Sequence, residues 1–187
     1  MLEEAWALAS EKGWDRVRVA DLAQRAEVSR PSIYAQFGDR AGIGRALVLR
    51  ETERFLATVA DVLKGQSDDV ALALEAAVAH TLTEAARNPF IVAVVTAARG
   101  GTDALLPFLT SRPEPVFSEA RHLVTAWLDT AAAERPATLR RDAADVAVRL
   151  TVSHMLLPSA GPDDTAARVA HAACAVLGVA VPTLSVR

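Results

Sequence analysis

The sequence predicts an all-α protein, with a three-helix N-terminal head followed by a larger helical body and about nine helices in total. Apolar residues recur at three- and four-residue spacing along most of the chain. The longest stretch that alternates like a β-strand is Val17 to Val19. Pro and Gly residues separate the periodic segments. We place the domain boundary so that residues 1–45 form the head and residues 46–187 form the body.

The head is expected to begin with a helix that ends at Gly13, followed by two short helices joined by a tight turn. The first short helix stops at about Ala26 and directs Asp21, Gln24 and Arg25 to water. Its apolar face consists of Val19, Leu22, Ala23 and Ala26.

The second short helix has a capping residue and one buried side. Ser29 can accept a backbone N–H as N-cap, and Pro31 lies in the first turn, where a missing N–H costs nothing. This helix start also offers free N–H groups and a positive dipole end to a phosphate. Ile33 and Phe37, one turn apart, form the buried side. The side chains left to meet a partner are Arg30, Ser32, Tyr34 and Gln36.

The chemistry of the exposed side chains suits a DNA duplex. Arg30 can pair with guanine or hold a phosphate, Gln36 can bridge an adenine edge, and Ser32 can contact a base or the backbone. Tyr34 and Arg40 fit contacts to phosphate. The alternative interpretation is an ordinary helical hairpin within a bundle.

Three runs in the head carry a family resemblance: ALASEKGW from Ala7, VADLAQRAEVS from Val19 and RPSIYAQFGDR from Arg30. With the Ile33, Tyr34 and Phe37 pattern that precedes Arg40, residues 2–55 resemble the TetR family of bacterial transcriptional regulators. The resemblance implies a helix-turn-helix DNA-binding domain, a ligand-binding and dimerisation domain, and a repressor released from its operator by a small molecule.

Two positions depart from the family pattern. Glu27 stands in the turn where Gly is usual, so a positive φ there would cost about 1 kcal/mol or more. Arg18 replaces the usual Thr or Ser cap and could reach a phosphate instead. The expected DNA-binding residues are therefore Arg18, Ser29, Arg30, Pro31, Ser32, Tyr34, Gln36 and Arg40.

Charge is uneven along the chain. The net charge is −3, yet Lys12 to Arg50 contains eight basic and four acidic residues, which suits a DNA-facing head on an acidic body. No apolar run approaches the roughly 18 residues of a membrane span. Glu3 and Glu4 occupy the region that is basic in a signal peptide, so we expect a cytoplasmic protein that does not enter a membrane.

The body continues with helical periodicity. Its expected helices run over about Ala41 to Leu63, Val70 to Arg87, Phe90 to Ala98, Val116 to Glu134, Leu139 to Leu156 and Asp163 to Leu177. The last two have alanine-rich apolar faces, which suit either a homodimer interface or the core of one chain. Those faces consist of Ala143, Val146, Ala147, Leu150 and His154, and of Ala166, Val169, Ala170, Ala173, Cys174 and Leu177.

The family resemblance implies a small-molecule effector within the body, a homodimer that forms through the two C-terminal helices, and a palindromic double-stranded operator that this homodimer reads. A largely apolar effector fits the residues available there. For each of these residues the alternative is an ordinary core or surface position. The candidate ligand-binding residues are Phe90, Val94, Phe108, Phe117, His122, Trp127 and His154.

An enzyme is the competing class and lacks support from motifs. The sequence contains no Gly-rich phosphate loop, no G-x-S-x-G and no Cys-x-x-Cys, and its histidines form no i,i+4 pair. We expect no cofactor and no metal site. A second alternative is a helical small-molecule carrier or partner-binding bundle with a degenerate DNA-binding head.

Overall fold

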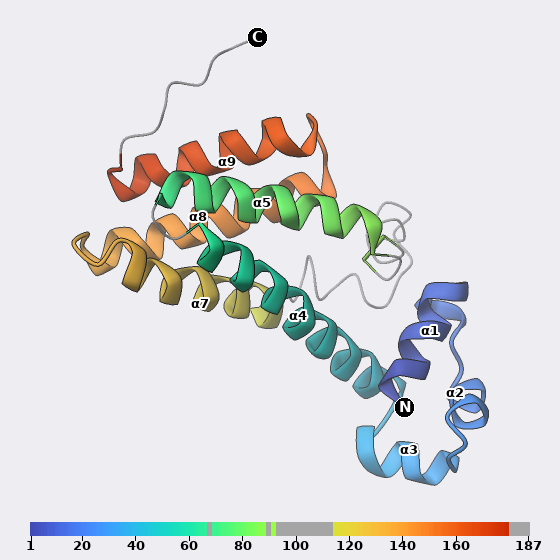
Figure 1. Ribbon diagram of the computed structural model, residues 1–187. Helices are drawn as coiled ribbons and strands as arrows, with labels where there is room; N and C mark the ends of the chain where they lie inside the picture. Colours follow the sequence, from blue (N-terminus) through green and yellow to red (C-terminus); the bar gives the residue numbers. More distant parts are fainter. Residues whose placement is uncertain (67–68, 89–90, 93–113, 180–187) are drawn as a thin grey trace. The chain divides into compact units, whose positions relative to one another are not determined.

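The computed structural model describes residues 1–66, 69–88, 91–92 and 114–179 (Figure 1). Two compact units are present: Met1–Arg54 with Arg87–Val116, and Phe55–Ala86 with Phe117–Arg187. Every regular element in the described ranges is a helix, which confirms the all-α prediction. Within those ranges, none of the helices is both long and apolar enough to cross a membrane. The domain boundary after residue 45 stays a prediction.

The first unit contains the head and has a compact apolar core. Its elements are α1 (Leu2–Lys12), the 3₁₀ helix η1 (Trp14–Arg16), α2 (Val19–Arg25), α3 (Arg30–Phe37) and the first half of α4 (Arg40–Gly65). Large side chains from separate helices meet at the centre, because no one of these short helices can bury its own apolar face. The fully buried ones are Leu22, Ile33, Ile43 and Leu47.

Ion pairs connect α1 to α2. Lys12 Nζ lies 2.6 Å from Asp21 Oδ2, and Arg25 lies 2.8 Å from both Glu4 and Glu11. Gln24 and Arg25 are exposed, as predicted, and Asp21 is partly covered. The ion pairs with α1 were not predicted, because they depend on two helices meeting.

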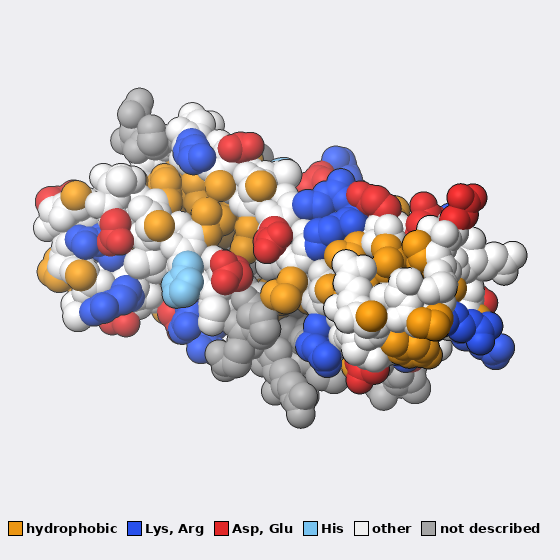
Figure 2. Space-filling view, turned by 90° about the horizontal axis from the view of Figure 1, so that it is seen from below, with side chains coloured by type: hydrophobic (Ala, Val, Ile, Leu, Met, Phe, Trp, Pro, Cys, Tyr) orange, Lys and Arg blue, Asp and Glu red, His pale blue; other side chains and the backbone are white. Residues whose placement is uncertain are grey.

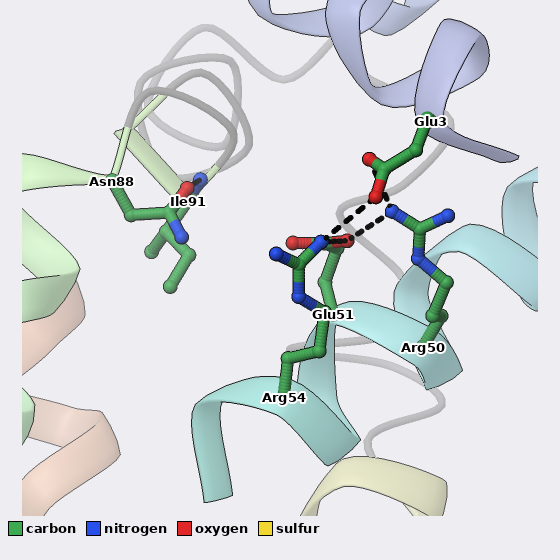
Figure 3. Close-up of polar contacts among 6 residues, drawn as sticks. All are labelled: Glu3, Arg50, Glu51, Arg54, Asn88 and Ile91. Atoms are coloured by element: carbon green, nitrogen blue, oxygen red, sulfur yellow. Dashed lines mark hydrogen bonds and ion pairs between the residues drawn. The ribbon is translucent and has the colours of Figure 1, made fainter. Parts of the chain in front are cut away.

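A second group of ion pairs connects the start of α1 to α4 (Figure 3). The Glu3 carboxylate lies 2.6 Å from Arg50 Nη2 and 3.3 Å from Arg54 Nη1. The Glu51 carboxylate lies 3.3 Å from Arg50 Nη2. The arginine hydrogen bond and charge lower the pKa of Glu3. Through these pairs, side chains far apart in the sequence hold α1 in place.

The second unit contains α8 (Ala137–Leu156) and α9 (Pro162–Leu177), the second half of α4, and all but the end of α5 (Val70–Arg87) and the start of α7 (Glu114–Ala131). Asp69 begins α5 by accepting the backbone N–H groups of Ala71 and Leu72. Of the helix expected from Phe90 to Ala98, only Ile91 and Val92 are described, and both are helical. The remainder lies outside the described residues.

The core of the second unit is rich in alanine, which lets helices approach closely. The face of α9 assigned to a dimer interface is fully buried within the single chain, as are Ala143 and Ala147 of α8. That interface assignment was therefore wrong for these residues, because α8 and α9 pack on each other. Of the predicted set, Val146, Leu150 and His154 are only partly covered.

Candidate DNA-binding surface

The recognition helix α3 begins at Ser29, as the sequence predicts. The Ser29 Oγ accepts the backbone N–H of Ser32 at 3.2 Å, and Pro31 lies in the first turn. The hydroxyls of Ser29 and Ser32 also share a hydrogen bond of 2.7 Å. Both serines therefore orient each other before any partner binds.

One side of α3 anchors it and the other is exposed. Ile33 is fully buried and Phe37 packs partly against the same core. Tyr34 is 48% exposed, which is high for a large side chain. The exposed side consists of Arg30, Pro31, Ser32, Tyr34, Ala35 and Gln36. Ala35 was not among the predicted residues, because a small apolar residue in a helix usually indicates a core position.

The exposed surface of the head has few charges at its centre. In Figure 2 the head lies on the right, with uncharged and apolar side chains in the middle and basic and acidic ones around them. Arg30 is the only charged residue of α3. An uncharged centre suits base edges in a groove, and the basic side chains among the charges around it suit the phosphates on either side.

The turn between α2 and α3 has the conformation suspected from the sequence. Glu27 has a φ of 54°, in the left-handed region. Val28 donates its N–H to the Ala23 carbonyl at 3.0 Å and Glu27 donates to Gln24 at 3.3 Å, which is the Schellman arrangement. A residue that usually needs to be Gly is therefore Glu in this chain, at a cost of about 1–2 kcal/mol.

Arg18 begins α2 without a side-chain cap, as predicted. The pKa of Asp21 is lowered, first by the Lys12 side chain and also by the backbone N–H of Arg18. A carboxylate three residues after the N-cap thus supports the helix start, as in one half of a capping box. The Arg18 guanidinium stays exposed.

Arg40 has a structural role that the sequence did not predict. Its Nε donates to the Val17 carbonyl at 3.0 Å, its Nη2 donates to the Trp14 carbonyl, and its guanidinium lies 5.0 Å from the centre of the Trp14 ring. These contacts join the link before α2 to the start of α4. Contact between Arg40 and phosphate stays a prediction.

The end of α3 lies directly against the start of α4. A Cβ on Gly42 would come within 1.8 Å of the Phe37 carbonyl oxygen. Only Gly allows this approach, so Gly42 fixes where α3 ends relative to α4.

Those candidate effector residues that the structure describes all lie in the second unit. Trp127 is buried, and its Nε1–H has no acceptor in the described structure. Phe117 is half-buried beneath the Arg149 guanidinium, His154 is half-buried and His122 is exposed. Phe90, Val94 and Phe108 lie outside the described residues. Among described residues, no cluster of metal-ligating side chains occurs.

A charged group beside Phe117 was missed from the sequence. The Asp145 carboxylate accepts a hydrogen bond from Arg149 Nε at 2.6 Å and one from Arg121 Nη1 at 3.2 Å. Burial opposes ionisation of Asp145, but the two arginines still lower its pKa. The four-residue spacing of Asp145 and Arg149 could have indicated their pair, whereas Arg121 comes from another helix.

Comparison with family models gives two matches that together extend over most of the chain. Residues 1–47 match the model of bacterial regulatory proteins of the tetR family. Residues 69–175 match the model of the C-terminal domain of the bacterial tetracyclin repressor.

Individual relatives agree with these matches. The chain is 27% identical over 164 residues to the HTH-type transcriptional regulator AlkX of Mycobacterium tuberculosis, covering 86% of the chain and 75% of that relative. It also resembles the crystal structure of the repressor AlkX from Dietzia sp. strain DQ12-45-1b, which is implicated in biodegradation of n-alkanes. That match has a TM-score of 0.76 and 26% identity and covers 95% of each chain. The structure of RolR without ligand shares the fold, with a TM-score of 0.65, 17% identity and 98% of each chain covered.

Proposed function

The chain belongs to the TetR family of bacterial regulatory proteins and is a DNA-binding transcriptional regulator; we propose that it is a repressor that a small apolar molecule releases from a palindromic operator. The observation that carries this proposal is the exposed side of α3. It presents Arg30, Ser32, Tyr34 and Gln36 outward from the buried Ile33. A carrier with a degenerate head would gain nothing from such a surface. A bacterial repressor acts on chromosomal DNA, so we place the protein in the cytoplasm.

We assign base contacts to Arg30, Ser32 and Gln36 and phosphate contacts to Arg18, Tyr34 and Arg40. The two serines already share a hydrogen bond, so Ser32 is held in place for its contact. Pro31 adds an apolar contact surface beside them, and the N-terminus of α3 at Ser29 favours a nearby phosphate.

A single eight-residue helix reads too few base pairs to be selective, so we propose a homodimer that reads a palindrome. The proposed interface uses the outer sides of α8 and α9. On α8 these include the partly covered Val146, and on α9 they include His171 and Ala175. Burying these side chains against a second copy would leave the Ala173 side of α9 in the core of its own chain.

The proposed effector is largely apolar and carries one hydrogen-bond acceptor. The support is the buried indole N–H of Trp127, because a buried donor without an acceptor costs about 1–3 kcal/mol that a ligand oxygen would recover. The similarity to a repressor implicated in n-alkane biodegradation suggests aliphatic chains as first probes. A ligand that binds more tightly to the form with low DNA affinity weakens operator binding. The affinity for the operator falls by at most the ratio of the ligand's affinities for the two forms.

The DNA-binding part is tested by mobility shift on duplexes from the DNA flanking the encoding gene. Arg30→Ala and Tyr34→Ala should each weaken specific binding, and removal of a bidentate base pairing costs about 1–3 kcal/mol, or roughly 5- to 150-fold. Arg141→Ala is the matched control, because Arg141 is an exposed arginine of α8 outside the head. A protein that shifts no duplex at low salt, or equal weakening by all three substitutions, would contradict the assignment.

The effector part is tested by thermal shift with n-alkanes, alkanols and fatty acids. A ligand at 100 times its dissociation constant stabilises the protein by about 2.7 kcal/mol. Alkanols and acids, which bear an oxygen, should stabilise the wild type more than alkanes of equal length, and Trp127→Phe should remove that difference. Stabilising ligands that leave the DNA shift unchanged would favour the carrier instead.

A further inference from the structure

The basic side chains of the head divide into those with partners and those without. Several form ion pairs with carboxylates, namely Lys12, Arg25, Arg45, Arg50 and Arg54. Arg40 is held by two backbone carbonyls. In the described part of the head, Arg16, Arg18 and Arg30 have neither an ion pair nor a side-chain hydrogen bond. Thus most of the positive charge counted from the sequence is already neutralised within the protein.

Two of the unpaired arginines lie on either side of a buried residue. Val17 is only 3% exposed, whereas Arg16 and Arg18 are exposed. Val17 and Arg18 both have extended backbone, with ψ of 121° and 145°. Arg16 is the last residue of η1 and Arg18 is the N-cap of α2, so the two exposed arginines lie at the two ends of a short link whose middle residue is buried.

The link that carries the two arginines is fixed to the end of the recognition helix. Arg40 follows α3 by three residues and binds the carbonyls of Trp14 and Val17. Arg40 also forms an ion pair of 3.9 Å with Asp15, so the cations of this segment without a carboxylate partner are Arg16 and Arg18. The result is a basic segment held in a defined position beside α3.

We propose that Arg16 acts with Arg18 as a phosphate clamp, in which the two guanidinium groups hold the DNA backbone beside the recognition helix. This inference rests on the proposed DNA-binding function and adds Arg16 to its contact residues. Guanidinium groups form strong bidentate hydrogen bonds with phosphate oxygens. Paired cations such as Arg25 would have to give up a carboxylate to do the same, so they should contribute little to DNA binding.

The test is the salt dependence of binding to a fluorescently labelled duplex of arbitrary sequence, measured by anisotropy from about 50 to about 200 mM KCl. Arg16→Ala should lower the slope of log K against log salt by about 0.9 for every phosphate that the protein no longer binds. Arg16→Lys should keep most of the slope. Arg25→Ala is the matched control, since it removes the same charge from a paired position and should leave the slope unchanged.

Three results would overturn the proposal while wild-type binding persists: an unchanged slope for Arg16→Ala, an equal fall for Arg16→Ala and Arg25→Ala, or an Arg16→Lys slope as low as that of Arg16→Ala. Thermal melts accompany each variant, and Arg16→Ala should melt like the wild type because Arg16 has no ion pair in the described head. If the wild type itself binds no duplex, the DNA-binding function fails, and the clamp fails with it.

Discussion

Both the head and the body have ion pairs between helices, but their cores differ in the share of alanine. In the head, short helices meet through large apolar side chains and through ion pairs such as Lys12–Asp21 and Arg25–Glu11. In the body, longer helices pack alanines such as Ala143 and Ala173 around fully buried leucines such as Leu128. Charge is thus part of the architecture of the head, and the cations left over are the ones available to DNA.

The largest expected effect comes from changing core volume in opposite directions in the two regions. Ile33→Ala should lower the free energy of unfolding by about 2–5 kcal/mol, because it leaves a cavity in the head. Ala173→Leu should lower it by about 1–3 kcal/mol, because the alanine face of α9 has no room for a larger side chain. Both values are measured by denaturant unfolding.

The control for both changes is Leu157→Ala. Leu157 is 74% exposed, so its truncation should change the free energy of unfolding by less than about 0.5 kcal/mol. If Leu157→Ala cost as much as Ile33→Ala, or if Ala173→Leu were neutral, the contrast between the two cores would not hold.

Local patterns in the sequence predicted the helices better than they predicted the surfaces. The cap at Ser29, the buried Ile33 and the left-handed Glu27 follow from rules that act within a few residues. The pairing of Arg25 with Glu11 depends on two helices meeting, and no local pattern contains that information. The same limit applies to the α9 face, where an apolar stripe suits a partner chain and a chain's own core equally.

Acid should affect the head more than the body, because the described head has three carboxylates with a lowered pKa and the described body has Asp145. The pKa values of Glu3, Glu11 and Asp21 are lowered, in each case chiefly by a hydrogen bond from a basic side chain. A lowered folded-state pKa gives stability that is present above the unfolded pKa of about 4 and is lost as pH falls through the folded value. Hydrogen exchange below about pH 4 should therefore show protection falling first in α1 and α2.

Two variants separate the ion pairs from general acid unfolding. Glu11→Gln should remove part of the acid sensitivity of the head, because that carboxylate no longer gains a proton on unfolding. Glu134→Gln, at an exposed acid of the body, should leave the profile unchanged. If hydrogen-exchange protection in α9 were lost at as high a pH as in α1, the ion pairs of the head would not determine its sensitivity to acid.

The smallest expected effect concerns two helix ends that share one motif. α2 and α9 both finish in the Schellman arrangement, but the left-handed position is Glu27 in the head and Gly178 in the body. Glu27→Gly should raise the free energy of unfolding by up to about 1 kcal/mol, while Gly178→Ala should lower it by about 1–2 kcal/mol. Glu27→Ala removes the same charge without relieving the left-handed strain, so it should not match the gain of Glu27→Gly. Equal stability of the two Glu27 variants would show that the turn is unstrained, and the departure from Gly would then matter only for the acidic charge it brings near DNA.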